Sequence, residues 1–216
     1  MKASVGVFVS VVALLLVGNP VAAQDIPRLA DGHPDMSGIW QVLNEANYDL
    51  EPHIARHSLQ MREGPVNPVP SIPTLRMGAV GAVPGSLGVI VGDGKIPYTA
   101  EARALKEENM AEWIDRDPEL KCYLPGIPRA MYMPYPFEII QSTNKIQMGY
   151  AFTSTARTIH LDQVEGPPDD TYMGHSVGRW EGDTLVVDVT DFNGRNWFDR
   201  AGNFHSAALR LEERFT

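Results

Sequence analysis

The chain has 216 residues, of which 44% are hydrophobic and 21% are charged. This composition is typical of one globular domain with an apolar core, and it excludes a fully disordered protein. The formal net charge is -9, so the chain lacks the excess of Lys and Arg that neutralises the phosphates of nucleic acids and anionic lipids. We therefore expect no nucleic-acid partner.

Residues 1–23 have the pattern of a signal peptide. Lys2 precedes an apolar run over residues 5–17, and small residues precede a cleavage point after Ala23. The run is shorter than the ~20 apolar residues that span a bilayer. This predicts a periplasmic or secreted protein with no stable membrane anchor after cleavage. The single cysteine, Cys122, cannot form an intramolecular disulfide, and we expect it to be a small buried hydrophobic residue.

Residues 24–95 are expected to form an irregular arm, because they are rich in Pro and Gly and lack sustained periodicity. Two elements interrupt it. The stretch "DMSGIWQV" at residues 35–42 predicts a short strand, and residues 44–63 predict a short helix with Pro52 near its start. The glycine-rich part lacks the spacing of a phosphate-binding loop, and we expect no cofactor.

His53 and His57 stand four residues apart and would share one face of the predicted helix. Two ligands of one zinc ion need this spacing. However, no Glu follows the first His as it does in the zinc-protease motif, and no third ligand is identifiable. We therefore predict no metal site and expect the pair on a solvated face.

Residues 96–216 are expected to form the folded domain, with a helix before antiparallel β-structure. Thr99 is the predicted N-cap of a helix over residues 100–115, which ends at Asp117 and Pro118. The apolar face of this helix consists of Ala102, Leu105, Met110, Trp113 and Ile114. The next segment, "CYLPGIPRAMYMPYPF", has too many prolines for a central strand. Its aromatic residues form either a lid over a ligand or packing across the edge of a sheet: Tyr123, Tyr132, Tyr135 and Phe137.

The C-terminal half has the alternating pattern of β-strands. The stretches "FEIIQS", "IQMGYAF" and "ARTIHLD" alternate with a period of two and are joined by short polar connections. The stretch "VGRWEGDTLVVDV" predicts a hairpin with one buried face. We expect a mainly β (α+β) fold, in which an antiparallel meander closes into a barrel or a sandwich and is accompanied by one or two helices.

Residues 174–178 read Gly-x-Ser-x-Gly, the pattern that places a nucleophilic serine in α/β-hydrolases. That site needs an apolar strand before the serine and a helix after it. Here "EGPPDDTYM" precedes the pattern and a hairpin follows it. A triad of Ser176, Asp199 and His205 would have the required order, but the flanking sequence argues against a serine hydrolase.

Several motifs resemble those of a group of exported bacterial proteins to which no activity is assigned. They are "DGHPDMSGIWQ", "KCYLPGIPRAMYMPYPFEI" and the run from "YMGHSVGRWEGDTLVVDV" through "NWFDRAGNFHS" to "ERFT". The resemblance covers nearly all of the mature chain and carries over no catalytic residues. Members of the group continue with further strands after "ERFT", which implies that the last strands of this domain are missing or supplied elsewhere. "DMSGIWQV" and the hairpin are also similar to lipocalin-like barrels, in which Trp40 would plug one end.

His175, Asp199 and His205 are the candidate catalytic residues. A histidine exchanges protons near neutral pH, and a neighbouring carboxylate can fix its tautomer and raise its basicity. A pair of this kind would serve a lyase, an isomerase or a hydratase, with Arg200 holding an anionic or carbonyl oxygen. The structural alternative is that Asp199 and Arg200 pair to fasten a loop while the histidines cap turns.

Large aromatic side chains are the candidate ligand-binding residues. Trp180 and Trp197 would line an apolar pocket together with Tyr132, Tyr135 and Arg200, although core packing is the more common role of such residues. The first hypothesis is therefore an exported β-barrel-like protein that binds an apolar or aromatic small molecule. The alternative is an acid–base enzyme that uses the same pocket, and a third class, a scaffold of the cell envelope, would need neither site.

Overall fold

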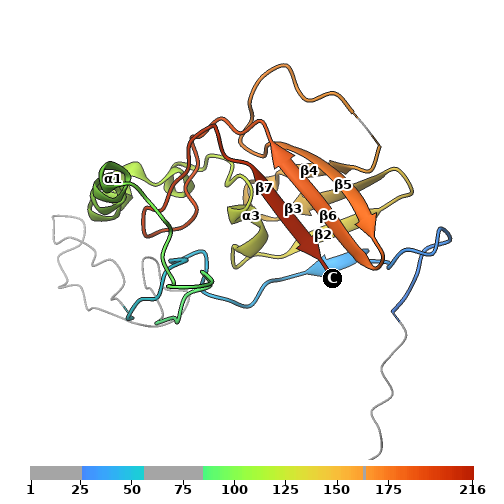
Figure 1. Cartoon of the computed structure of the whole chain (residues 1–216), viewed down its shortest axis with the longest axis horizontal. Coiled ribbons are helices and arrows are strands. Elements are labelled where there is room, and N and C mark those ends of the chain that lie inside the picture. The colour runs from blue at the N-terminus through green and yellow to red at the C-terminus, as the bar shows by residue number, and fades with distance from the viewer. Residues whose placement is uncertain (1–25, 56–84, 163) are drawn as a thin grey trace, which may run out of the picture.

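The computed structural model describes residues 26–55, 85–162 and 164–216, and its main feature is one seven-stranded sheet. The strands lie side by side in the order of the sequence, and the sheet curls into a half-barrel (Figure 1). This confirms the predicted mainly β fold class. The strands are β1 (Gly38–Trp40), β2 (Phe137–Gln141), β3 (Lys145–Tyr150), β4 (Ala156–His160), β5 (His175–Glu181), β6 (Thr184–Thr190) and β7 (Leu211–Phe215).

The alternating pattern of the strands decides which side chains enter the core. In β2, Phe137 and Ile139 are buried while Glu138 and Ile140 are exposed, as expected when one face of a sheet is covered. The inward side chains of neighbouring strands join in one cluster, because alternate positions share a face. Its fully buried members include Ile146, Met148, Ile159, Leu185, Val187, Val189 and Phe192.

The prediction of an antiparallel meander is wrong at one junction. β4 and β5 are parallel and pair only at two positions, Ile159 with Ser176 and His160 with Val177. A parallel pair requires the chain to cross back to the same end of the sheet before the second strand begins. The chain makes that crossing between His160 and His175, where residues 161–162 and 164–174 are described. The alternating pattern of the strands does not report their direction.

Short helices accompany the sheet within the described ranges. They are α1 (Ala100–Ala111), α2 (Trp113–Arg116) and α3 (Arg129–Tyr132), with the 3-10 turns η1 (Pro118–Lys121) and η2 (Phe152–Ser154). Thr99 accepts a hydrogen bond from the backbone N–H of Ala102, which confirms the predicted N-cap. No helix in the described part of the chain is long and apolar enough to cross a membrane. The predicted signal peptide lies outside the described residues.

The predicted helix at residues 44–63 is wrong in its described part, because residues 44–55 form turns and bends. Short polar side chains explain the difference. The side chain of Asn44 accepts from the backbone N–H of Ala46, and that of Asp49 accepts from the N–H of Glu51. Such local bonds compete with helical ones. His57 lies outside the described residues.

Two burial predictions in the helical region are also wrong. Helix α1 buries Lys106 and Asn109, whereas Leu105 on the predicted apolar face is exposed. The side of α1 that faces the rest of the protein differs from the predicted one, because Lys106, Asn109 and Met110 lie against Gly202. Cys122 is exposed and follows η1 as its C-cap, with φ of 57°, so it is not the expected buried hydrophobic residue.

Candidate functional site

The predicted catalytic residues are not brought together. His175 begins β5, and its Nε2 lies 3.2 Å from the carbonyl oxygen of Val164. His205 directs Nδ1 toward the carbonyl oxygen of Ser206 at 3.0 Å. Asp199 bonds to neither histidine within the described part of the chain. The predicted histidine–aspartate pair is therefore not formed.

His205 is held by aromatic packing. Its ring contacts Phe192 edge-on and Phe198 at a tilt, with ring centroids 5.6 Å and 5.1 Å away. Burial lowers the pKa of His205 below its usual value, although the bond to the carbonyl oxygen of Ser206 opposes this. The neutral imidazole is therefore the form that the fold accommodates.

Asp199 fastens a loop to the N-terminal segment. Its carboxylate is fully buried and accepts backbone N–H bonds from Leu50, Ala201 and Asn203, together with a bond of 2.7 Å from Asn203 Nδ2. Burial raises the pKa of Asp199 to about 7, with a further contribution from Asp49. Four donors surround this carboxylate, which suits an anchor for loops better than a proton acceptor for a ligand.

Arg200 belongs to a buried network of charges. Its guanidinium donates two hydrogen bonds to Glu119, at 2.9 Å and 2.6 Å, and lies over the ring of Tyr48. Arg129 donates to Glu119 and Asp117 from the other side. Arg200 therefore pairs with Glu119 instead of Asp199, and its donors are directed at protein groups.

The two predicted ligand-binding tryptophans have different surroundings. Trp180 stacks on His33, with ring centroids 4.6 Å apart and planes 6° apart. Trp197 is buried at 8% exposure and its backbone bridges to Phe204. Neither residue lines the cavities described below.

The tyrosine-rich segment packs onto the sheet. The hydroxyl of Tyr132 in α3 donates to the carbonyl oxygen of Phe198 at 2.8 Å, and Tyr135 stacks on Phe152 with centroids 5.4 Å apart. Ala130 of the same helix belongs to the core cluster of the sheet. These contacts correspond to the packing alternative for this segment and not to a lid.

An apolar cavity of about 590 Å³ lies between the first strands of the sheet and its last strand. We call it the edge cavity. Trp40 of β1 lines it and is 49% exposed, so it does not plug a closed barrel as the lipocalin resemblance implies. The indole N–H of Trp40 donates to the carbonyl oxygen of Met36. The lining consists of Ile26, Pro27, Pro34, Asp35, Met36, Trp40, Phe137, Ile139, Asp183, Arg214, Phe215 and Thr216.

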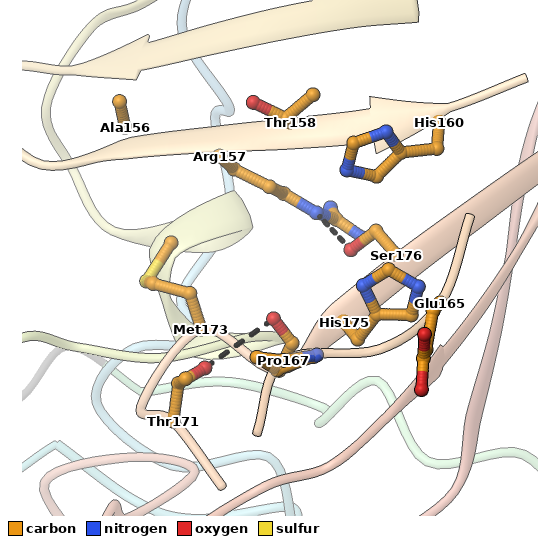
Figure 2. Close-up of a pocket in the computed structure, with 11 residues that line it drawn as sticks. Ala156, Arg157, Thr158, His160, Glu165, Pro167, Thr171, Met173, His175 and Ser176 are labelled. Carbon is orange, nitrogen blue, oxygen red and sulfur yellow. Dashed lines mark hydrogen bonds between the residues drawn. The ribbon is translucent and has the colours of Figure 1, made fainter. Parts of the chain in front are cut away.

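A second, more polar pocket of about 330 Å³ lies where the parallel strands β4 and β5 diverge. We call it the fork pocket. His160 and His175 enter it from the two strands, with Ser176 and Arg157 beside them (Figure 2). Its lining consists of Ala156, Arg157, Thr158, His160, Glu165, Pro167, Thr171, Met173, Gly174, His175 and Ser176.

Ser176 lies inside a strand and is 2% exposed. Its Oγ accepts a hydrogen bond of 2.9 Å from Nε of Arg157 (Figure 2). The chain continues along β5 into a hairpin, so the strand–turn–helix geometry of a nucleophile elbow is not present here. The Gly-x-Ser-x-Gly pattern therefore marks the start of a sheet strand, and the hydrogen-bond partner of its serine is the Arg157 cation and not a histidine base.

No family model, no curated protein and no solved structure matches this chain. The two cavities are therefore the evidence on function. Sequence reasoning missed His160 because it stands in a regular strand pattern, and it assigned Trp40 only a structural role. Their surroundings depend on strand divergence and sheet curvature, which local patterns do not encode.

Proposed function

We propose that the protein binds a small apolar or aromatic molecule in the edge cavity. The observation that carries the proposal is the cavity itself, whose volume of about 590 Å³ lies in the range of about 300–1,000 Å³ typical of small-molecule sites. The proposal includes export, because residues 1–23 have the pattern of a signal peptide.

The lining indicates the class of ligand. Trp40, Phe137 and Phe215 offer aromatic surface, which favours flat apolar or aromatic rings. Two charged side chains of the lining have ionic partners: Asp183 binds Arg28, and Arg214 binds Glu181 and Glu212. The third, Asp35, accepts the backbone N–H of Ser37. A charged ligand would have to compete with these pairs, so an uncharged ligand is favoured.

The ligand class predicted from the sequence is kept, while the residues that hold the ligand change. Trp180, Trp197 and Arg200 face other protein groups, and Trp40 takes their place. The alternative, an acid–base enzyme, would need a hydrogen-bonded pair of a histidine and Asp199. That pair is not formed, because His175 and His205 each face a carbonyl oxygen and Asp199 binds amide donors.

The test is a fluorescence titration of the purified chain with N-phenyl-1-naphthylamine, an uncharged aromatic probe. We expect saturable binding by the wild type and about tenfold weaker binding by Trp40→Ala, because loss of a large aromatic contact costs about 1–3 kcal/mol. The matched control is Ile39→Ala, which changes the next residue of β1, a side chain 79% exposed, and should bind like the wild type. Absence of saturable binding, or equal binding by Trp40→Ala, would contradict the proposal.

A further inference from the structure

The fork pocket places two imidazoles around one space. His160 ends β4 and His175 begins β5, and their ring centroids lie 5.5 Å apart with planes tilted by 32° (Figure 2). The two rings are neighbours because the parallel strands pair at the end of β4 and the start of β5, with His160 inside the paired stretch and His175 just before it. The rings are tilted and in contact, so a ligand that both of them bind has to lie at their ring nitrogens and not between their faces.

The hydrogen bond of His175 decides which ring nitrogen can act as a ligand. The carbonyl oxygen of Val164 can only accept, so the Nε2 that lies 3.2 Å from it carries the hydrogen. Nδ1 of the neutral ring therefore keeps its lone pair. Histidines that bind metals usually donate their other N–H to a carbonyl or carboxylate oxygen in this way, which fixes the tautomer and raises the basicity of the ligand.

The ring of His160 is also available to a ligand. Its side chain lines the pocket and forms no hydrogen bond with the residues that the structure describes. Its ring nitrogens therefore compete with no protein partner when a metal binds the deprotonated ring.

The surrounding charges favour a cation over an anion. Glu165 lines the pocket, and Asp191 lies beside His175, since a side-chain carbon on Gly166 would come within 3.0 Å of the Asp191 carboxylate and 3.8 Å of the His175 ring. Arg157 is the nearest cation in the lining, and Glu213 of β7 neutralises it. The positive charge of Lys145 opposes this effect.

We infer that the fork pocket binds a divalent transition-metal ion through His160 and His175. Imidazole nitrogens bind Zn²⁺ at about 2.0–2.1 Å, and two rings with centroids 5.5 Å apart are close enough to reach one ion. Among the described residues no group of three His, Cys, Asp or Glu side chains is close enough to hold a metal, so water would fill the remaining positions. An ion with open positions can bind a further oxygen or nitrogen ligand. This inference does not depend on the edge cavity.

The test is calorimetric titration of the purified chain with Zn²⁺ alone. We expect one ion to bind, and we expect His160→Gln and His175→Gln each to weaken binding by at least about tenfold, since even outer-shell changes cost 10–100-fold. The control is His33→Gln, whose ring stacks on Trp180 away from the fork pocket, and it should bind like the wild type. Absence of stoichiometric binding, or binding by either pocket variant as tight as that of the wild type, would overturn the inference. Loss of binding in His53→Gln would overturn it too, by placing the ion at the other histidine pair.

A spectroscopic measurement separates a ligand role from a structural one. In ¹⁵N NMR spectra of the wild type, Zn²⁺ should shift Nδ1 of His175 while Nε2 keeps its proton. A shift at Nε2 alone, or no shift at either nitrogen, would contradict the assignment. Thermal unfolding of both glutamine variants without zinc should match the wild type, since both imidazoles are only partly buried.

Discussion

At the scale of single residues, the buried cation Arg129 is the most consequential side chain of the polar network. It is 1% exposed and compensates Asp117 and Glu119, which are also buried. We expect Arg129→Met to lower the free energy of unfolding by about 3–5 kcal/mol, because the buried carboxylate of Asp117 loses its cationic partner and that of Glu119 keeps only Arg200. Urea denaturation measures this change.

The control for Arg129 is a cation on the surface. Arg179 pairs with Glu181 and Asp188, but these side chains are about half exposed. We expect Arg179→Met to change the free energy of unfolding by less than about 1 kcal/mol, since exposed ion pairs contribute little. Equal losses in the two variants would show that burial does not determine the effect.

His205 should make stability depend on pH. Burial lowers its pKa from the ordinary 6.5, so the unfolded chain takes up a proton at a higher pH than the folded chain does. This contribution to stability is complete above pH 6.5 and is lost as the pH falls from there to the folded-state pKa, with a slope of at most about 1.4 kcal/mol per pH unit.

The variant that isolates this effect is His205→Phe, which keeps a ring between Phe192 and Phe198 and does not titrate. From pH 8 to pH 5 the denaturation midpoint of the wild type should fall relative to that of the variant. A constant difference between the two curves would show that His205 does not carry the dependence. Asp199, whose pKa is raised to about 7, and His160, whose pKa is lowered, also titrate, but these groups are present in both proteins and cancel in the comparison.

For single residues, the sequence does not reveal hydrogen-bond partners that stand far away along the chain. The sequence drew attention to Asp199, which is buried, and to Arg200, which is partly buried in a network of charges. Besides nearby donors of its own loop, Asp199 binds Leu50. Arg200 binds Glu119, and both of these partners stand far away along the chain. Local clustering cannot identify such partners, and for that reason the predicted catalytic group does not assemble.

At the scale of elements, the start of β5 depends on Gly174. Its φ is +68°, and a side-chain carbon there would lie 2.7 Å from the carbonyl oxygen of Thr190 and 2.8 Å from Val189 Cγ1. We expect Gly174→Ala to destabilise the protein by at least about 2 kcal/mol, because left-handed strain adds to the steric clash.

Gly149 in β3 provides the matched control. It lacks a positive φ, and a side-chain carbon would meet nothing within 4 Å. We expect Gly149→Ala to be neutral or to stabilise the protein by up to about 1 kcal/mol, since alanine restricts the unfolded chain. Chemical denaturation of both variants checks the pair, and a Gly174→Ala protein as stable as the wild type would refute the argument.

Most strands were predictable because one-sided burial leaves a period of two in the sequence. β2, β3, β4 and the β5–β6 hairpin were all expected from this pattern. Two features could not be found in this way. The parallel pairing of β4 and β5 leaves the pattern unchanged, and β7 carries three consecutive charged residues that hide any alternation.

At the scale of the whole molecule, the half-barrel is bridged by the segment over residues 26–36. Arg28 forms two hydrogen bonds with Asp183 in the β5–β6 turn, and His33 stacks on Trp180. The same segment contributes Met36 to the edge cavity, which Phe215 at the C-terminal end of β7 also lines. The segment therefore connects the first strands to the far side of the sheet across the cavity.

Loss of the stacking between His33 and Trp180 should loosen the segment over residues 26–36 without unfolding the sheet. A stacked aromatic pair contributes about 0.5–1.5 kcal/mol, so Trp180→Ala should accelerate hydrogen exchange about 2–10-fold at the bonded amides of Leu29, Gly32 and Asp35. The amides of β6 should keep their protection, because that strand is paired on both sides. Trp180→Phe retains a stacking ring and should exchange like the wild type. Faster exchange in β6 as well would mean that the segment stabilises the whole sheet, whereas unchanged exchange in Trp180→Ala would mean that Arg28 alone holds it.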